Sequence, residues 1–186
     1  MNRRSLQSGY TLVEMLVTLV IMGIAAALLV PVLGAFGAIE TQAAVRRLVS
    51  DIAFAQSDAV ARQGYRRVHF FADGTGWCLV NIDDTDFFDA FNAGTADYLP
   101  DPARVTRGGG DFIVDLAADD RFASVQVESV TTAEGPTNVT FDALGGTVAA
   151  PGTAAGAVTV VLSGDDSRWE VDVAPVTGRT TVQKLN

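Results

Sequence analysis

The sequence predicts an α+β protein, in which a long N-terminal helix is followed by a domain of short antiparallel strands. Three observations lead to this class. An almost wholly apolar run follows a short basic segment at the start of the chain. A helical stripe of apolar residues continues beyond that run, and alternating strand-like segments separated by turn-rich loops fill the remainder.

Composition limits the chemistry that this chain can perform. The 186 residues suffice for one domain with an appendage, and the net charge of −9 opposes binding to nucleic-acid phosphates unless a local basic patch exists. Cys78 is the single cysteine, so an internal disulfide is excluded. His69 is the only imidazole, and Cys78 lies in an apolar strand-like stretch. We interpret Cys78 as a buried, unreactive thiol and predict no enzyme activity, metal site or cofactor.

The first part of the helix is predicted to cross a membrane. Residues 10–33 are nearly all apolar and long enough for a bilayer core. Arg3 and Arg4 precede the run and predict a cytoplasmic start with the remainder outside. The alternative is a cleaved secretory signal peptide with small residues near Gly37 and Ala38. The run exceeds the usual signal core of about 7–15 residues, which favours an anchor.

Glu14 is unexpected inside this apolar run. An ionised side chain in hydrocarbon costs a few kcal/mol and usually has a partner, yet no basic residue lies within one helical turn of Glu14. Cleavage between Gly9 and Tyr10 would create a new α-amine four residues before Glu14, and this amine would be cationic near neutral pH. The alternative is a glutamate near the interface whose carboxylate reaches the headgroups.

The leader that ends in Gly9, the aromatic Tyr10 and the following "TLVEML" together resemble the signal of type IV prepilins and type II secretion pseudopilins. The resemblance implies cleavage after Gly9 by a prepilin peptidase, which also methylates the new N-terminus at Tyr10. It implies that Glu14 pairs with the N-terminal amine of a neighbouring subunit during assembly at an inner-membrane platform. The family usually has phenylalanine where this chain has Tyr10. Pro31 stands where the family's helix often carries a proline, which predicts a kink there.

The second part of the helix, residues 34–64, is predicted to be amphipathic. Its apolar residues recur at three- and four-residue spacing, which indicates one buried stripe: Val45, Leu48, Ile52, Ala55 and Ala59. Asp58 and Arg62 lie off this stripe in the favourable order for an ion pair. Gly64 is expected to end the helix, and Pro31 with Gly34 is expected to form its flexible point.

Eight segments after the helix are strand-like. Two of them flank the turn sequence "DGTG" and predict a hairpin, and the eight together are residues 66–72, 76–82, 112–116, 124–130, 138–144, 157–163, 168–174 and 179–185. A long polar interval, residues 83–111, separates the second from the third. We interpret its aspartates as a solvated loop rather than a calcium site. Its phenylalanines either face another protein or fix the loop to its own core: Phe87, Phe88 and Phe91.

The later segments "RRLVSDIAFAQSDAVARQGYRRVHF", "VTFDALGGTV" and "RWEVDVAPVTGRTTVQ" resemble, in order, GspH/FimT-type minor pseudopilins. This resemblance implies two packed sheets against the helix and a low-abundance subunit at a filament tip. It also implies a single-pass inner-membrane protein that is organised as a leader (1–9), a membrane helix (10–33), an amphipathic helix (34–64) and a periplasmic domain (65–186). The expected partners are the peptidase, other pseudopilins or pilins, the assembly platform and the inner membrane.

DNA uptake or adhesion by a type IV minor pilin is the alternative function. DNA-binding proteins of the FimT type carry repeated arginines after the last turn glycine. Here only Arg179 follows Gly178, and Lys184 is the other nearby cation. One or two phosphate contacts give little affinity at physiological salt. The sequence therefore predicts a structural subunit of a type II secretion pseudopilus, with DNA as an improbable partner.

Overall fold

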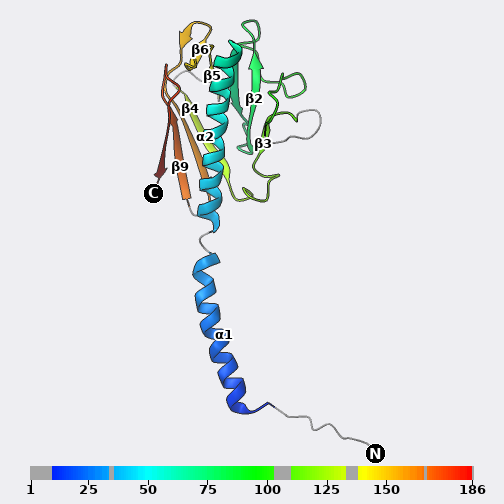
Figure 1. Cartoon of the computed structure of the whole chain (residues 1–186), viewed down its shortest axis with the longest axis vertical. Coiled ribbons are helices and arrows are strands. Elements are labelled where there is room, and N and C mark those ends of the chain that lie inside the picture. The colour runs from blue at the N-terminus through cyan, green and yellow to red at the C-terminus, as the bar shows by residue number, and fades with distance from the viewer. Residues whose placement is uncertain (1–9, 34–35, 103–109, 133–137, 166, 186) are drawn as a thin grey trace, which may run out of the picture. The chain divides into compact units, whose positions relative to one another are not determined.

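The computed structural model describes residues 10–33, 36–102, 110–132, 138–165 and 167–185. The chain divides into two compact units, Met1–Phe36 and Gly37–Asn186 (Figure 1). The first unit contains helix α1, Leu12–Leu33, and the second begins with helix α2, Phe36–Arg62, whose first residue belongs to the first unit. The sequence predicted one long helix, and its described helical parts are residues 12–33 and 36–62.

The helix α1 presents mostly apolar side chains at its surface from Leu12 to Ala27. Leu12, Leu19 and Met22 are among the large apolar side chains that lie exposed. Pro31 lies within α1, and Gly34 lies outside the described residues, so the kink predicted there stays a prediction. In the described part of the chain, no helix is both long enough and apolar enough to cross a membrane.

The domain after residue 37 has two antiparallel four-stranded sheets, which confirms the predicted α+β class. The first sheet has the order β3-β2-β1-β5, formed by Ile113–Asp115, Gly76–Ile82, Tyr65–Phe70 and Asn138–Phe141. The second has the order β10-β9-β8-β4, formed by Thr180–Leu185, Ser167–Val173, Val158–Gly164 and Gln126–Thr132. All eight predicted strands are present.

The structure adds a small ribbon that the sequence did not predict. Strands β6 (Val148–Ala150) and β7 (Thr153–Ala154) pair with each other. Their residues are mostly alanine, with a proline and a glycine between them, and they lack the β-branched alternation that marks a strand. Strand β5 is also shorter than predicted, because the Asp142 carboxylate accepts hydrogen bonds from the backbone of Leu144 and Gly146 and starts a turn.

The helix α2 packs on both sheets and supplies the centre of the core. The predicted stripe is confirmed, since its five residues are at most 2% exposed: Val45, Leu48, Ile52, Ala55 and Ala59. They share one cluster with side chains from the first sheet, such as Trp77 and Phe141, and from the second, such as Leu162 and Val171. Figure 1 shows α2 lying along the domain, with strands of the two sheets on either side.

Two aspartates on α2 anchor it to the first sheet. Asp51 is 3% exposed and accepts hydrogen bonds from Arg47 Nε at 2.9 Å and Trp77 Nε1 at 3.0 Å. Burial raises the pKa of Asp51 more than these two donors lower it. Asp58 accepts from Arg62 Nε at 2.9 Å, as predicted, and from Arg66 Nε of β1 at 2.5 Å.

A third polar contact joins α2 to two turns, and we call it the Gln56 clamp. Gln56 Nε2 donates to the carbonyl oxygens of Gly145 at 2.6 Å and Thr177 at 2.9 Å. Gly178 follows with a φ of +62°, and a Cβ there would lie 2.5 Å from Gln56 Nε2 and 2.8 Å from the Phe141 ring. The clamp explains why glycines recur in "DALGG" and "VTGR", because the helix approaches the backbone of both turns closely.

We expect Gly178→Ala to destabilise the domain through this contact. Gly152→Ala is the matched control, because Gly152 has a φ of +74° and open space around its Cβ position. The positive φ costs about 1–2 kcal/mol in both variants, and crowding adds about 1–3 kcal/mol only at Gly178. Urea unfolding of the full chain in detergent measures the difference. Equal losses in the two variants would show that the clamp does not restrict this position.

We expect Asp58→Asn to remove a pH-dependent part of the stability. Burial alone would raise the pKa of Asp58, but hydrogen bonds from Arg66 and Arg62 outweigh it and hold the pKa below 3.8. A lowered pKa stabilises the fold above pH 3.8, and this contribution disappears as the pH falls through the folded-state pKa.

The free energy of unfolding should therefore differ between wild type and Asp58→Asn by about 1–3 kcal/mol at pH 7, and the two proteins should converge in acid. Asp51 titrates in both, so its contribution cancels in the difference. A difference that stays constant from pH 7 to pH 3 contradicts this assignment.

Candidate functional site

The first turn of α1 contains Glu14, on which the predicted function depends. The backbone N–H of Glu14 donates to Thr11 Oγ1 at 3.2 Å, and the N–H of Met15 donates to the Thr11 carbonyl oxygen at 3.2 Å. Thr11 is therefore the N-cap of α1, and Glu14 is its third helical residue. Threonine followed by glutamate at this spacing is the capping-box pattern, which our sequence analysis did not use.

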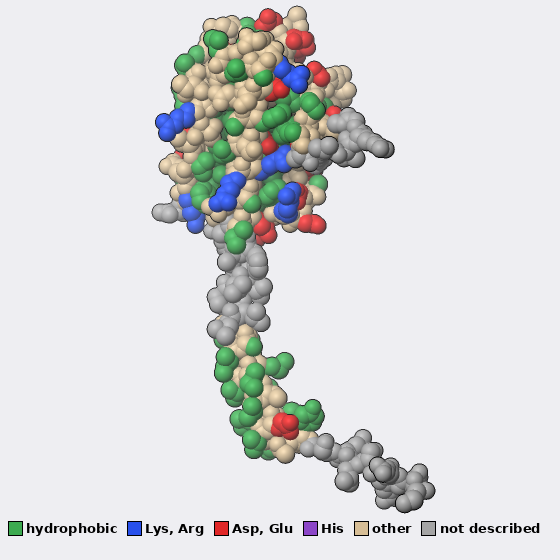
Figure 2. Space-filling view, in the orientation of Figure 1, with side chains coloured by type: hydrophobic (Ala, Val, Ile, Leu, Met, Phe, Trp, Pro, Cys, Tyr) green, Lys and Arg blue, Asp and Glu red, His purple; other side chains and the backbone are tan. Residues whose placement is uncertain are grey.

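The capping geometry gives Glu14 a structural role that competes with the predicted assembly role. A carboxylate in the first turn is stabilised by the helix dipole, so Glu14 favours helix formation at this point. The Glu14 side chain is nevertheless exposed and has no ion-pair partner among the described residues. Its neighbours Leu12, Val13 and Met15 are exposed apolar side chains. Figure 2 shows acidic atoms within this otherwise apolar surface.

The other predicted residues of the N-terminal site have different placements. Tyr10 precedes α1 and is 75% exposed. Gly9 lies outside the described residues, so its predicted cleavage stays a prediction. Tyr10 and Glu14 thus flank the capped helix start, with Thr11 between them. The chemistry available there is a single carboxylate on an apolar surface, which attracts a cation when both are removed from water.

Arg179 and Lys184, the predicted DNA contacts, do not form one basic patch. Both are exposed, and they are five residues apart along an extended segment. Side chains alternate between faces, so these two point to opposite sides at a separation of about 16 Å. Two residues of β10, Thr181 and Gln183, pair with Asp172 and Glu170 of β9, which places acids on that surface.

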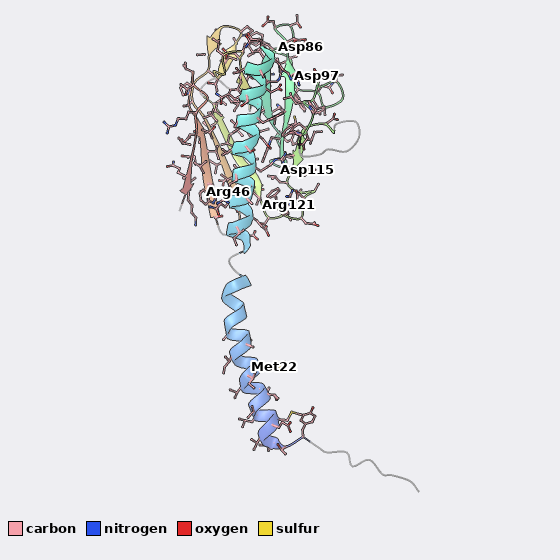
Figure 3. The ribbon with its side chains drawn as sticks, viewed as in Figure 1. Met22, Arg46, Asp86, Asp97, Asp115 and Arg121 are labelled. Carbon is pink, nitrogen blue, oxygen red and sulfur yellow. The ribbon has the colours of Figure 1, made fainter. Side chains whose placement is uncertain are left out.

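Most of the described arginines of the domain are already neutralised by carboxylates. Those in ion pairs are Arg47, Arg62, Arg66, Arg121 and Arg168. Figure 2 shows Lys and Arg side chains interspersed with acidic and apolar ones on the visible face, and Figure 3 labels Arg46 and Arg121 on it. This arrangement gives little counterion release on DNA.

The three phenylalanines of the polar interval divide between the two roles left open by the sequence. Phe87 is 4% exposed and meets the Tyr65 ring edge-on, with 5.4 Å between centroids. Phe91 stacks on His69 at 4.0 Å. Phe88 is 76% exposed. Phe87 and Phe91 therefore fix the interval to the domain, and for the exposed Phe88 the alternative of facing another protein stays a prediction.

His69 and Cys78 are cross-strand neighbours in β1 and β2, but they do not form a catalytic dyad. Burial raises the pKa of the Cys78 thiol to about 12. Burial and the charge of Arg67 lower the pKa of His69, so both side chains are neutral at pH 7. A neutral thiol is a poor nucleophile. Among the described residues, no three acidic, histidine or cysteine side chains are grouped to hold a metal.

Two features define the class of pilin-like subunits. One is a capped apolar helix that carries a single acid, and the other is a domain in which a helix packs on two sheets. Residues 4–30 match the prokaryotic N-terminal methylation motif. The chain belongs to the family of the type II transport protein GspH, which it matches over residues 44–177. Members of this family are structural subunits.

Two solved structures are similar to this chain. The minor pseudopilin EpsH from the type 2 secretion system of Vibrio cholerae is 10% identical, with a TM-score of 0.51, over 78% of this chain and 97% of that chain. The type IV minor pilin FimU of Pseudomonas aeruginosa is 16% identical, with a TM-score of 0.45, over 77% of this chain and 88% of that chain. A search of curated protein sequences gave no match.

Proposed function

We propose that this protein is a minor pseudopilin, a structural subunit that helps to initiate or cap a type II secretion pseudopilus in protein export. The observation that carries the proposal is the match to the GspH family over residues 44–177, behind a methylation motif over residues 4–30. Filament subunits need an exposed surface that other subunits cover. The exposed apolar side chains of α1 supply such a surface.

The processing that we propose begins with cleavage after Gly9. The leader, residues 1–9, stays in the cytoplasm, and Tyr10 becomes the methylated N-terminus. Residues 10–33 anchor the subunit in the inner membrane, residues 34–64 continue as the amphipathic helix, and residues 65–186 lie in the periplasm. The methylation motif supports a prepilin peptidase as the first partner, and the family supports other pseudopilins and the inner-membrane assembly platform as later ones.

The proposed role of Glu14 is to pair with the N-terminal amine of a neighbouring subunit. Its carboxylate is exposed on an apolar surface, and Thr11 already satisfies the backbone N–H of Glu14. The side chain is therefore available to a second molecule. When subunits associate, apolar surroundings would desolvate the carboxylate, and a cation at the docking position would compensate for that cost. If two subunits associate in the wrong register, the Glu14 carboxylate stays unpaired. The ion pair therefore favours the correct register.

A DNA-uptake or adhesion pilin is the alternative function, and the domain offers it little support. Arg179 and Lys184 face opposite ways, and Glu170 and Asp172 lie beside β10. A polyanion at Arg179 would therefore meet carboxylates on the same face, and Lys184 would be a single cation on the other.

We expect Glu14→Gln to stop assembly while leaving the helix start intact. Glutamine at the third helical position still fits a capping box, whereas the charge is lost. Breaking a buried pair costs about 3–5 kcal/mol, so incorporation should fall at least about 100-fold. Cross-linking to other pseudopilins in host membranes measures it. Thr11→Ala is the control, because it removes the cap and keeps the charge, and it should still assemble. Wild-type assembly of Glu14→Gln would make Glu14 a capping residue only.

The mass of the N-terminal peptide tests processing directly. Protein recovered from host membranes should yield a peptide that begins at a methylated Tyr10. A start near Ala38 would make the chain a secreted domain released by a signal peptidase and would exclude an assembly role for Glu14. An intact Met1 would indicate a simple membrane anchor.

A further inference from the structure

The polar interval covers a cavity beside the first sheet that the proposed function does not use. The cavity has a volume of about 160 Å³ and lies between β1, β5 and the β6–β7 ribbon. Phe87 and Phe88 form part of its wall. They belong to the segment that also carries Asp86, which is labelled near the upper end of the domain in Figure 3. We call it the Arg67 cavity, after the cation that lines it.

Arg67 is a buried cation with neutral partners. Its side chain belongs to β1, and the residue is 7% exposed. Nε donates to Thr140 Oγ1 at 2.9 Å, and one terminal nitrogen donates to the Phe87 carbonyl oxygen at 2.6 Å. The guanidinium also lies 5.1 Å from the centroid of the Phe87 ring. Asp89 lines the cavity as well, but no carboxylate of the described residues lies within ion-pair distance of Arg67.

The hydrogen-bonding groups that line this cavity are not all satisfied among the described residues. A guanidinium has five N–H groups, and Arg67 uses two of them on the neutral oxygens of Thr140 and Phe87. Thr147 also lines the cavity, is 1% exposed, and its hydroxyl has no hydrogen-bond partner among the described residues. Buried polar groups are normally hydrogen-bonded. A buried cation with only neutral partners among the described residues, beside a hydroxyl with none, therefore indicates a ligand that accepts hydrogen bonds.

The remaining wall combines apolar residues with the polar Asp89, Thr132 and Asn138, and its apolar part suits a carboxylate carried on an apolar stem. Val139, Val148 and Val158 line the cavity together with the Phe87 ring. One guanidinium matches one carboxylate in a bidentate pair, whereas a phosphate dianion would keep an uncompensated charge against apolar walls. Phe88, which is 76% exposed, offers an apolar contact beside the entrance.

We propose that the Arg67 cavity receives an aspartate or glutamate side chain from a neighbouring subunit. The carboxylate accepts from the Arg67 guanidinium and from the Thr147 hydroxyl, and Phe88 covers the incoming segment. The source of the carboxylate rests on the proposed function, because assembly places other subunits against this domain. The recognition itself depends only on the buried cation and the walls around it.

The probe for this site is the peptide Ac-Leu-Glu-Leu-amide, with Ac-Leu-Gln-Leu-amide as the uncharged control. The full chain in detergent micelles is titrated with each, and amide chemical shifts of Phe88 and Val148 are followed by NMR. We expect saturable shifts with a Kd of about 1–10 mM for the glutamate peptide and binding at least about 10-fold weaker for the glutamine peptide. Equal binding of the two peptides overturns the proposal.

Arg67→Gln should abolish binding, but a change at this buried residue can also unfold the domain. Ala155→Leu avoids this difficulty, because Ala155 lines the cavity and a larger side chain would fill it without touching the charge of Arg67. The neighbouring Ala154, which is exposed and does not line the cavity, provides the matched control Ala154→Leu. Binding should be lost only in Ala155→Leu. Undiminished binding in that variant overturns the proposal.

Hexanoate distinguishes a free acid from a polypeptide side chain. If hexanoate binds and the glutamate peptide does not, the ligand is a small carboxylate and the subunit proposal is wrong. The peptide assay needs no filament, so its result is independent of the Glu14 assembly assay. If the peptide fails to bind while the assembly assay succeeds, only the proposal for the Arg67 cavity is wrong. If the peptide binds but assembly and processing fail, a neighbouring subunit is excluded as the source.

Discussion

The apolar face of α2 is the constraint on which the domain depends. The two four-stranded sheets are separate hydrogen-bonded units, so nothing in their ladders joins one to the other. The buried stripe of α2 contacts side chains from both and closes a single core. Polar contacts then hold the helix at three positions along its length. Asp51 accepts a hydrogen bond from Trp77, Gln56 donates to two turns, and Asp58 accepts from Arg66. The stripe supplies the buried apolar surface, and the polar contacts set the position of α2 along its own axis.

Charge is distributed differently in the two units of the chain. In the domain, carboxylates such as Asp51, Asp58 and Glu128 have arginine partners. In α1, the Glu14 carboxylate has none among the described residues. Arg67 is a buried cation of the domain that likewise has no carboxylate partner among the described residues. An unmatched charge on an apolar surface is costly once water leaves, so both sites gain from a partner of opposite charge. The two proposed contacts of one subunit therefore use charges of opposite sign, the carboxylate of Glu14 and the guanidinium of Arg67.

The sequence indicated the helix and strands well, because their signals are local. The stripe of α2 follows from three- and four-residue spacing, and the eight strands follow from alternation between turn residues. The β6–β7 ribbon was missed because "VAAPGTA" has neither signal. The capping box at Thr11 is also a local signal, but the prediction for Glu14 rested on its charge and not on its position in the first turn.

By itself, the sequence determined the α+β class, the family resemblance and the residues of the N-terminal signal, because each depends on the order of residues over short distances. Only the tertiary structure decided which long-range groups meet. Gln56 reaches turns that lie 89 and 121 residues further along the chain, and Phe87 turns inward while Phe88 stays exposed. Arg67 is buried and bonds to Phe87 and Thr140, and it has no carboxylate partner among the described residues. Such pairings depend on packing between segments that are remote in sequence, and no local pattern encodes them.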